Sequence, residues 1–277
     1  MRQVNTEQCK LCGNKSILQE SHLIPKSLYK TIAQSFEPYD TAPIWASNTQ
    51  KSILYSNKQI TKKLLCKKCE DFFNKNGEKY VSRQCMKNAT TFELKQILDS
   101  SIPSVQLYGS SYFHPDDLQN VNTDKYLYFI ASIAWRVSVI DWKNPDIFML
   151  YNSIPIKAME ALKKFLLGKS IFPRDIYVTV CVDNDINPMP IISLPSGDIK
   201  KNMHMSLFIP GIKFNIFFGE EADKNVSYHF KKMRTNILFM YRSFRNSKEF
   251  QELKRLVIYE TQPKGKLAKE KIDKKKH

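Results

Sequence analysis

The chain has 277 residues, 42% of them hydrophobic and 12% aromatic, a composition that is typical of a folded globular protein and excludes an intrinsically disordered one. Lys and Arg number 43 against 27 Asp and Glu, so the formal net charge of +16 favours nucleic acid or another acidic partner; the alternative is a soluble protein that is merely rich in lysine. No run of about 18 apolar residues occurs and the N-terminal segment lacks an apolar signal core, so we expect neither a membrane span nor secretion, and hence a cytoplasmic protein.

Two cysteine pairs, CKLCG at 9–13 and CKKCE at 66–70, lie near the N-terminus. Paired cysteines in a chain without a secretion signal favour metal ligands over disulfides. Four thiolates suit a closed tetrahedral zinc site that staples a small fold. We therefore predict a structural zinc ion, and the four residues that would bind it are Cys9, Cys12, Cys66 and Cys69.

The segment 70–86 predicts a helix that begins at the second cysteine pair. Phe72, Phe73, Tyr80 and Val81 are expected to pack inward. Gly77 weakens the middle of this helix.

Residues 96–123 are rich in Ser, Pro, Asp and Asn, which is typical of a connector. From residue 124 the character changes, and the apolar residues over 124–142 have the spacing of a buried helix. The amphipathic pattern over 156–170 predicts a second helix, with Gly168 as its C-terminal stop.

Strand signals follow these helices. The segment 175–182 is rich in Val, Tyr and Thr, and 203–219 predicts two strands joined at Pro210-Gly211. Residues 226–260 predict one or two terminal helices. We therefore expect an α+β domain over 124–262, and a basic disordered tail over 263–277.

Between the cysteine pairs stands ESHLIPK, with His22 at its centre. In order and rough spacing, CKLCG, ESHLIPK and LLCKKCE resemble the zinc-stapled branch of the HNH, or His-Me finger, endonucleases. The chain is also similar to uncharacterised bacterial HNH-like proteins that carry a later Trp-Arg pair, here Trp135-Arg136. The resemblance covers residues 7 to 85, and the Trp-Arg pair extends it through residue 180. It implies a zinc-bound ββα-metal, treble-clef-like finger over residues 1–95.

The resemblance implies metal-dependent hydrolysis of phosphodiester bonds in DNA, with RNA left open. An effector role in anti-phage defence and a protein partner bound through the second half are also implied. His22 matches the general base, since an imidazole that titrates near neutrality can activate water; the alternative is a structural histidine. One Mg²⁺ or Mn²⁺ ion would stabilise the developing phosphate charge.

The implied catalytic metal ligands depart from the family pattern. Ser21 stands where the family has an acidic residue or a histidine, and Glu20 lies one residue further back. Alternation along a strand would place Glu20 and His22 on one face and Ser21 on the other. In a nuclease, Glu20, His22 and Glu70 should converge on one point.

Glu70 matches a second ligand on the first helical turn, with a solvated acid at a helix N-terminus as the alternative. Asn74 and Glu78, expected on the same helix face, are further candidate ligands for magnesium. The family's orienting asparagine has no clear counterpart here, although Thr61 lies near its place.

Lysines around the finger could contact phosphates, with a solvated surface as the alternative. The candidates are Lys26, Lys62, Lys63, Lys67 and Lys68. The rival function, favoured by Ser21 and by the missing asparagine, is a catalytically degenerate zinc module that binds nucleic acid or a protein partner.

Overall fold

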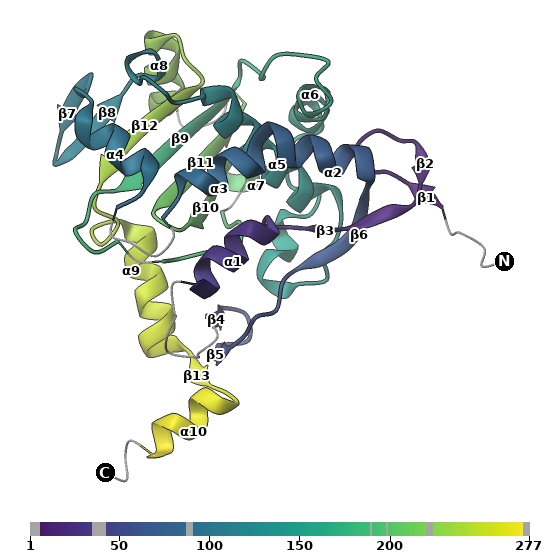
Figure 1. Ribbon diagram of the computed structural model, residues 1–277, viewed down its shortest axis with the longest axis vertical. Helices are drawn as coiled ribbons and strands as arrows, with labels where there is room; N and C mark the ends of the chain where they lie inside the picture. The colour runs from purple at the N-terminus through teal and green to yellow at the C-terminus, as the bar shows by residue number, and fades with distance from the viewer. Residues whose placement is uncertain are drawn as a thin grey trace.

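The computed structural model describes residues 6–34, 43–86, 91–188, 190–197, 199–219 and 224–273 (Figure 1). Its fold is mixed α+β, as the sequence predicts. Among the described helices, none has both the length and the apolar character that crossing a bilayer requires.

The N-terminal part is a short ribbon, a hairpin and a helix. The ribbon pairs β1 (Glu7–Gln8) with β2 (Lys15–Ser16), and the hairpin pairs β3 (Leu18–His22) with β6 (Thr61–Cys66), both antiparallel. Helix α2 (Lys67–Phe73) begins directly after β6, with Cys66 as its N-cap residue. The second cysteine pair therefore lies at a strand-to-helix junction.

The helix predicted over 70–86 is confirmed, but it contains a π-helical turn. Its three parts are α2, η1 (Asn74–Glu78) and α3 (Lys79–Gln84). Phe73 and Val81 are fully buried, whereas the inward packing predicted for Phe72 is wrong, because its side chain is 40% exposed. Gly77 lets this helix approach α5 (Thr123–Val139) closely, since a Cβ at Gly77 would stand 2.8 Å from the backbone nitrogen of Phe129.

A subdomain interrupts the β3–β6 hairpin and receives the C-terminal end of the chain. It consists of α1 (Lys26–Gln34), β4 (Ile44–Ser47) and β5 (Ser52–Tyr55). Strand β13 (Gln262–Pro263) pairs in parallel with β5, and α10 (Lys266–Asp273) packs against β5. The disordered tail predicted from residue 263 is therefore wrong through residue 273, because backbone pairing orders it; residues 274–277 lie outside the described chain.

Six strands of the described chain form one sheet in the order β10-β11-β9-β12-β8-β7. Neighbours are antiparallel except β9 and β12, which are parallel. The strands are β7 (Val105–Leu107), β8 (Ser110–Phe113), β9 (Ile176–Asp183), β10 (His204–Ile209), β11 (Ile212–Phe218) and β12 (Ile237–Arg242). The predicted strands at 175–182 and 203–219 are confirmed, and Gly211 turns between β10 and β11 with φ +75°.

The connector predicted over 96–123 is wrong. It contributes most of α4 (Glu93–Ser100), the edge strand β7 with its neighbour β8, and the 3-10 turn η2 (Pro115–Asp117). These strands are short and partly exposed at the sheet edge, so their sequence lacks the continuous apolar run of the central strands.

The remaining helices complete the fold around the sheet. Helix α5 is buried along most of its length, and α6 (Ile156–Leu166) ends as predicted near Gly168, which has φ +69°. The others are η3 (Pro145–Leu150), α7 (Ile199–Asn202), α8 (Lys224–Met233), α9 (Lys248–Arg255) and η4 (Leu256–Glu260).

One hydrophobic core runs through both halves of the chain. Leu64 and Phe73 from the N-terminal part belong to the same buried cluster as Phe129 of α5 and Phe214 of β11. The predicted boundary between a finger at 1–95 and an associated domain at 124–262 is therefore not a break in packing. Helix α5 is the element that joins the two halves.

Candidate metal centre and the His22 site

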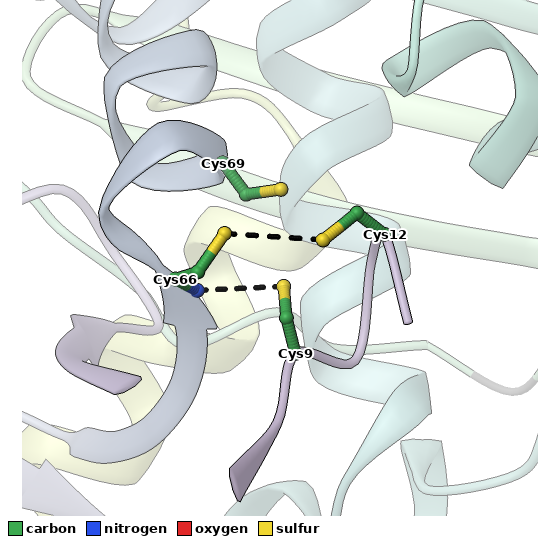
Figure 2. Close-up of side chains that lie close together, drawn as sticks. All are labelled: Cys9, Cys12, Cys66 and Cys69. Atoms are coloured by element: carbon green, nitrogen blue, oxygen red, sulfur yellow. Dashed lines mark hydrogen bonds between the residues drawn. The ribbon is translucent and has the colours of Figure 1, made fainter. Parts of the chain in front are cut away.

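The four predicted zinc ligands converge, as Figure 2 shows. Cys9 and Cys12 come from the β1–β2 turn, and Cys66 and Cys69 from the start of α2. Their sulfur atoms all lie within 4.8 Å of one another, and the Sγ atoms of Cys12 and Cys66 are 3.9 Å apart. Sulfurs around a tetrahedral zinc ion are about 3.8 Å apart, because Zn–S bonds are about 2.3 Å long. The four cysteines could therefore hold a metal ion such as zinc.

Local backbone contacts help to shape this cluster. The Cys66 amide donates to Cys9 Sγ at 3.4 Å, and the Gly13 amide donates to the Cys9 carbonyl at 2.9 Å. Gly13 has φ +81°, a conformation that glycine adopts readily. The first pair is thus turned toward the second by its own loop.

The electrostatics of the thiols favour a cation. Burial raises the pKa of Cys69 and of Cys66. Burial also acts upward on Cys9, but backbone hydrogen bonds at Cys12, Cys66 and Leu11 bring the pKa of Cys9 down to about 7. One thiolate therefore forms readily, while further negative charge in this pocket needs a positive partner, which a metal ion supplies.

No second group of three or more metal-binding side chains converges within the described ranges. Two of the candidate magnesium ligands, Ser21 and Glu70, contact each other. The buried Ser21 hydroxyl donates a hydrogen bond to Glu70 Oε1 and accepts one from the Leu65 amide at 3.2 Å. The structure therefore brings together the residue before His22 and the residue after Cys69.

Glu20 does not join them. It is exposed on the other face of β3, opposite Lys63 of β6, so the expected alternation of Glu20 and Ser21 is confirmed. The predicted convergence of Glu20 with Glu70 is wrong, because the strand alternation that buries Ser21 turns Glu20 outward.

Glu70 lies in a partly desolvated position. Burial raises its pKa above the usual range, while the hydrogen bond from Ser21 and the charge of Arg136 act in the opposite direction. The carboxylate thus has a neutral donor and a cation nearby, but only one oxygen atom is engaged by Ser21.

His22 has a lowered pKa, chiefly because burial disfavours the imidazolium. A side-chain hydrogen bond with Gln59 acts upward, and the charges of Lys26 and Arg136 act downward. The neutral imidazole therefore predominates at pH 7, as a general base requires.

Gln59 is the residue that the sequence argument missed. It lies just before β6, near the place expected for the family's orienting asparagine, and its side chain hydrogen-bonds to His22. A search for any side-chain amide shortly before β6, rather than for asparagine alone, would have found it. Thr61, the residue nearest that place, is the strand partner of His22.

Arg136 connects this site to helix α5. It is 1% exposed, donates to the His22 carbonyl at 2.7 Å and pairs with Glu78 at 2.7 Å. Glu78 is therefore committed to an ion pair rather than free to bind magnesium alone. Asn74 is exposed and lies one α-helical turn after Glu70, since its backbone amide donates to the Glu70 carbonyl. The π turn changes the spacing only between Asn74 and Glu78.

The candidate phosphate-binding lysines divide into two groups. Lys62 donates to the Asp141 carbonyl, and Lys67 forms an ion pair with Asp71 at 2.8 Å. Lys26, Lys63 and Lys68 are exposed and have no ion pair among the described residues.

Comparisons of the chain with protein-family models, with curated proteins and with solved structures find no match in any of the three.

Proposed function

We propose that this protein is a metal-dependent HNH-type endonuclease that hydrolyses phosphodiester bonds in DNA, with zinc as a structural ion. The observation that carries the proposal is the contact between Glu70, which follows Cys69, and Ser21, which precedes His22 in the sequence. In the zinc-stapled family these are the positions of the metal ligands and the base. Under this proposal, the β1–β2 ribbon, the β3–β6 hairpin and α2 would form the treble-clef-like finger.

The chain's own groups fit the separate roles. His22, neutral and oriented by Gln59, would take the proton from an attacking water. The Ser21 hydroxyl and the Glu70 carboxylate offer the oxygen donors that magnesium prefers, and an ion held there would neutralise charge on the phosphate. Lys26, Lys63 and Lys68 would hold flanking phosphates.

A second candidate function is a zinc module that binds nucleic acid without cutting it. The specific observation in its favour is that Glu20 faces away and that Glu70 already accepts a hydrogen bond from a neutral serine. Such a pair offers magnesium one charged ligand. Both candidate functions use the same surface to bind nucleic acid, but only the nuclease hydrolyses it.

A cleavage assay separates them. Supercoiled plasmid and single-stranded circular DNA are incubated with the wild type in Mg²⁺ or Mn²⁺, beside His22→Ala and the matched control His229→Ala, whose histidine is exposed on α8. We expect cleavage by the wild type and the control, and a loss of about 100-fold or more in His22→Ala. Equal rates for His22→Ala and the wild type would refute the assignment of the base, and no cleavage by any variant would favour the second candidate.

The pH dependence gives an independent readout. Because the pKa of His22 lies below its ordinary value, its neutral form persists below about pH 6.5. The cleavage rate should therefore stay level down to weakly acidic pH and fall only as His22 becomes protonated. A fall that begins well above pH 7 would indicate a different base.

A further inference from the structure

A large groove lies next to the His22 site. It has a volume of about 1740 Å³ and runs between α1 with the β4–β5 hairpin on one side and α9 with η4 on the other. The segment 190–196 forms part of its lining. Figure 1 shows these elements in the lower half of the molecule. Ordinary small-molecule pockets have volumes of about 300–1,000 Å³, so the groove has room for an extended ligand.

The walls of the groove are tied together by the backbone and by polar contacts. The Gln262 amide donates to the Lys51 carbonyl at 2.9 Å, and the Lys264 amide to the Ile53 carbonyl at 2.8 Å. On another side, the Thr49 amide donates to Asp146 at 2.9 Å. The groove is therefore preformed by segments that are distant in the sequence.

Apolar side chains make up much of the lining. Ile44 is 47% exposed on β4 and Ile258 is 52% exposed on η4, whereas Trp45, Ile192 and Leu194 are half-buried against the core. A flat or apolar ligand group that covers these side chains would remove apolar area from water, which favours binding.

Cations stand along the groove. Lys26, Lys30, Lys58 and Lys254 line it, are exposed, and form no ion pair within the described part of the chain. Three acids also line the groove. Glu260 pairs with Lys51 and Arg255, and Glu252 pairs with Lys248. The third, Asp146, accepts hydrogen bonds from Thr49. The groove thus combines an apolar surface with uncompensated positive charge.

We propose that this groove binds a single strand of nucleic acid. A single strand has bases with flat apolar faces for Trp45 and its neighbours and phosphates for the lysines. A duplex hides its base faces and would leave the apolar lining uncovered. An apolar peptide would leave the lysines without partners in a chain of charge +16.

One end of the groove reaches the His22 site. Gln59, which hydrogen-bonds to His22, lines the groove, as does Lys26, whose charge acts on the pKa of His22. A strand lying in the groove would therefore have a phosphate near the proposed base. This last step rests on the proposed function, whereas binding in the groove does not.

Binding is tested by fluorescence anisotropy with a labelled strand of about 16 nucleotides, the upper end of the site size of single-strand-binding folds. DNA and RNA strands are compared with a duplex of the same length and with an acidic peptide, all with the full-length His22→Ala chain so that nothing is cleaved. We expect the strand to bind at least tenfold more tightly than the duplex and the peptide. Equal or tighter binding of either competitor would overturn the proposal.

Two groove variants locate the site. Trp45→Ala should weaken single-strand binding by roughly 5- to 100-fold through lost stacking. The triple variant Lys30→Gln, Lys58→Gln, Lys254→Gln should reduce the slope of log affinity against log salt by about 2, since each phosphate contact on a single strand contributes about 0.7. The control with the same change in charge is Lys157→Gln, Lys164→Gln, Lys169→Gln, at and beyond α6 and outside the groove.

The outcomes distinguish this proposal from the proposed function. If both triple variants lose affinity equally, binding is a general charge effect and the groove assignment is wrong. If the groove variants bind poorly and a chain with intact His22 cuts no nucleic acid, the groove stands and the nuclease does not. Each variant must keep the zinc content and the melting temperature of the wild type. Photo-crosslinking of an iodouracil-containing strand to the β4 peptide gives a second readout that needs no substitution in the groove.

Discussion

The Arg136 guanidinium donates a hydrogen bond to the backbone carbonyl of His22 at 2.7 Å, from a helix more than a hundred residues further along the chain. The same guanidinium pairs with Glu78 and lies over the ring of Phe73, 5.2 Å from its centroid. Helix α5 therefore holds the end of β3 and the π turn in one arrangement. The candidate active site depends on the second half of the protein for its geometry.

Replacing Arg136 should destabilise the protein strongly. In Arg136→Met the Glu78 side chain, 13% exposed, becomes an unpaired and mostly buried carboxylate, and we expect a loss of about 3–5 kcal/mol in the free energy of unfolding. The double variant Arg136→Met, Glu78→Leu should recover much of this loss, because it removes the stranded charge. Urea unfolding measures both, and a single variant within about 1 kcal/mol of the wild type would contradict the role of the pair.

The four-cysteine centre should be required for folding. We expect about one zinc ion per chain by metal analysis, and loss of the folded state on chelation or in Cys66→Ser. Binding of structural zinc contributes about 10–16 kcal/mol, as much as the whole stability of a typical domain. Cys85→Ala is the matched control, since Cys85 is buried but outside the cluster. Zinc-free protein that melts like the zinc-loaded form would count against the centre.

Substitutions of Ser21 should lower the stability of the protein, and an acidic substitution should make that stability depend on magnesium. Ser21→Ala leaves Glu70 and the Leu65 amide without their partner, at a cost of about 1–3 kcal/mol. Ser21→Asp places two carboxylates together, so its melting temperature should fall without magnesium and rise when magnesium is added. Ser21→Asn, uncharged and similar in size to Asp, should show no such response. If Ser21→Asp also ignores magnesium, the pair does not form a cation site.

Gly77→Ala should destabilise the protein although alanine is the better helix former. The new Cβ would stand 2.8 Å from the Phe129 nitrogen and 2.9 Å from its Cα, and neither backbone atom can move without shifting α5. We expect a net loss of about 1–3 kcal/mol, against a helix-propensity gain of about 1 kcal/mol. Lys79→Ala, exposed two residues along, should stay within about 0.5 kcal/mol of the wild type. Thermal melting of the two variants compares these effects.

Asp183 should make the protein less stable as the pH rises. Burial raises the pKa of Asp183 to about 6 in the folded protein, against 3.8 as the ordinary value. The folded state therefore binds a proton that the unfolded state releases, so this contribution is complete below pH 3.8 and is lost as the pH rises through about 6, amounting to about 2–3 kcal/mol. Asp183→Asn keeps an oxygen acceptor for the Phe244 amide and should lose this pH dependence. Parallel stability curves for the two proteins between pH 4 and 7 would show that Asp183 does not titrate as argued.

The sequence by itself determined the features whose signal is local. Two CxxC pairs predict one thiolate cluster, because few other arrangements use such spacing in a chain without disulfides. The strands β9, β10 and β11 follow from runs rich in β-branched and aromatic residues, which are buried on both faces of the sheet. The helices α5 and α6 follow from apolar residues at helical spacing.

Only the tertiary structure decided the features that depend on distant partners. Three contacts join segments that are remote in the sequence: the Gln59 side chain with His22, the Arg136 side chain with the His22 carbonyl, and the pairing of β13 with β5. Strands β7 and β8 were missed because both are short, and β7, the edge strand, buries none of its residues. A local sequence pattern indicates which face of a segment is buried, but not which distant segment covers that face. The candidate site depends on contacts between distant segments, so only the tertiary structure shows it.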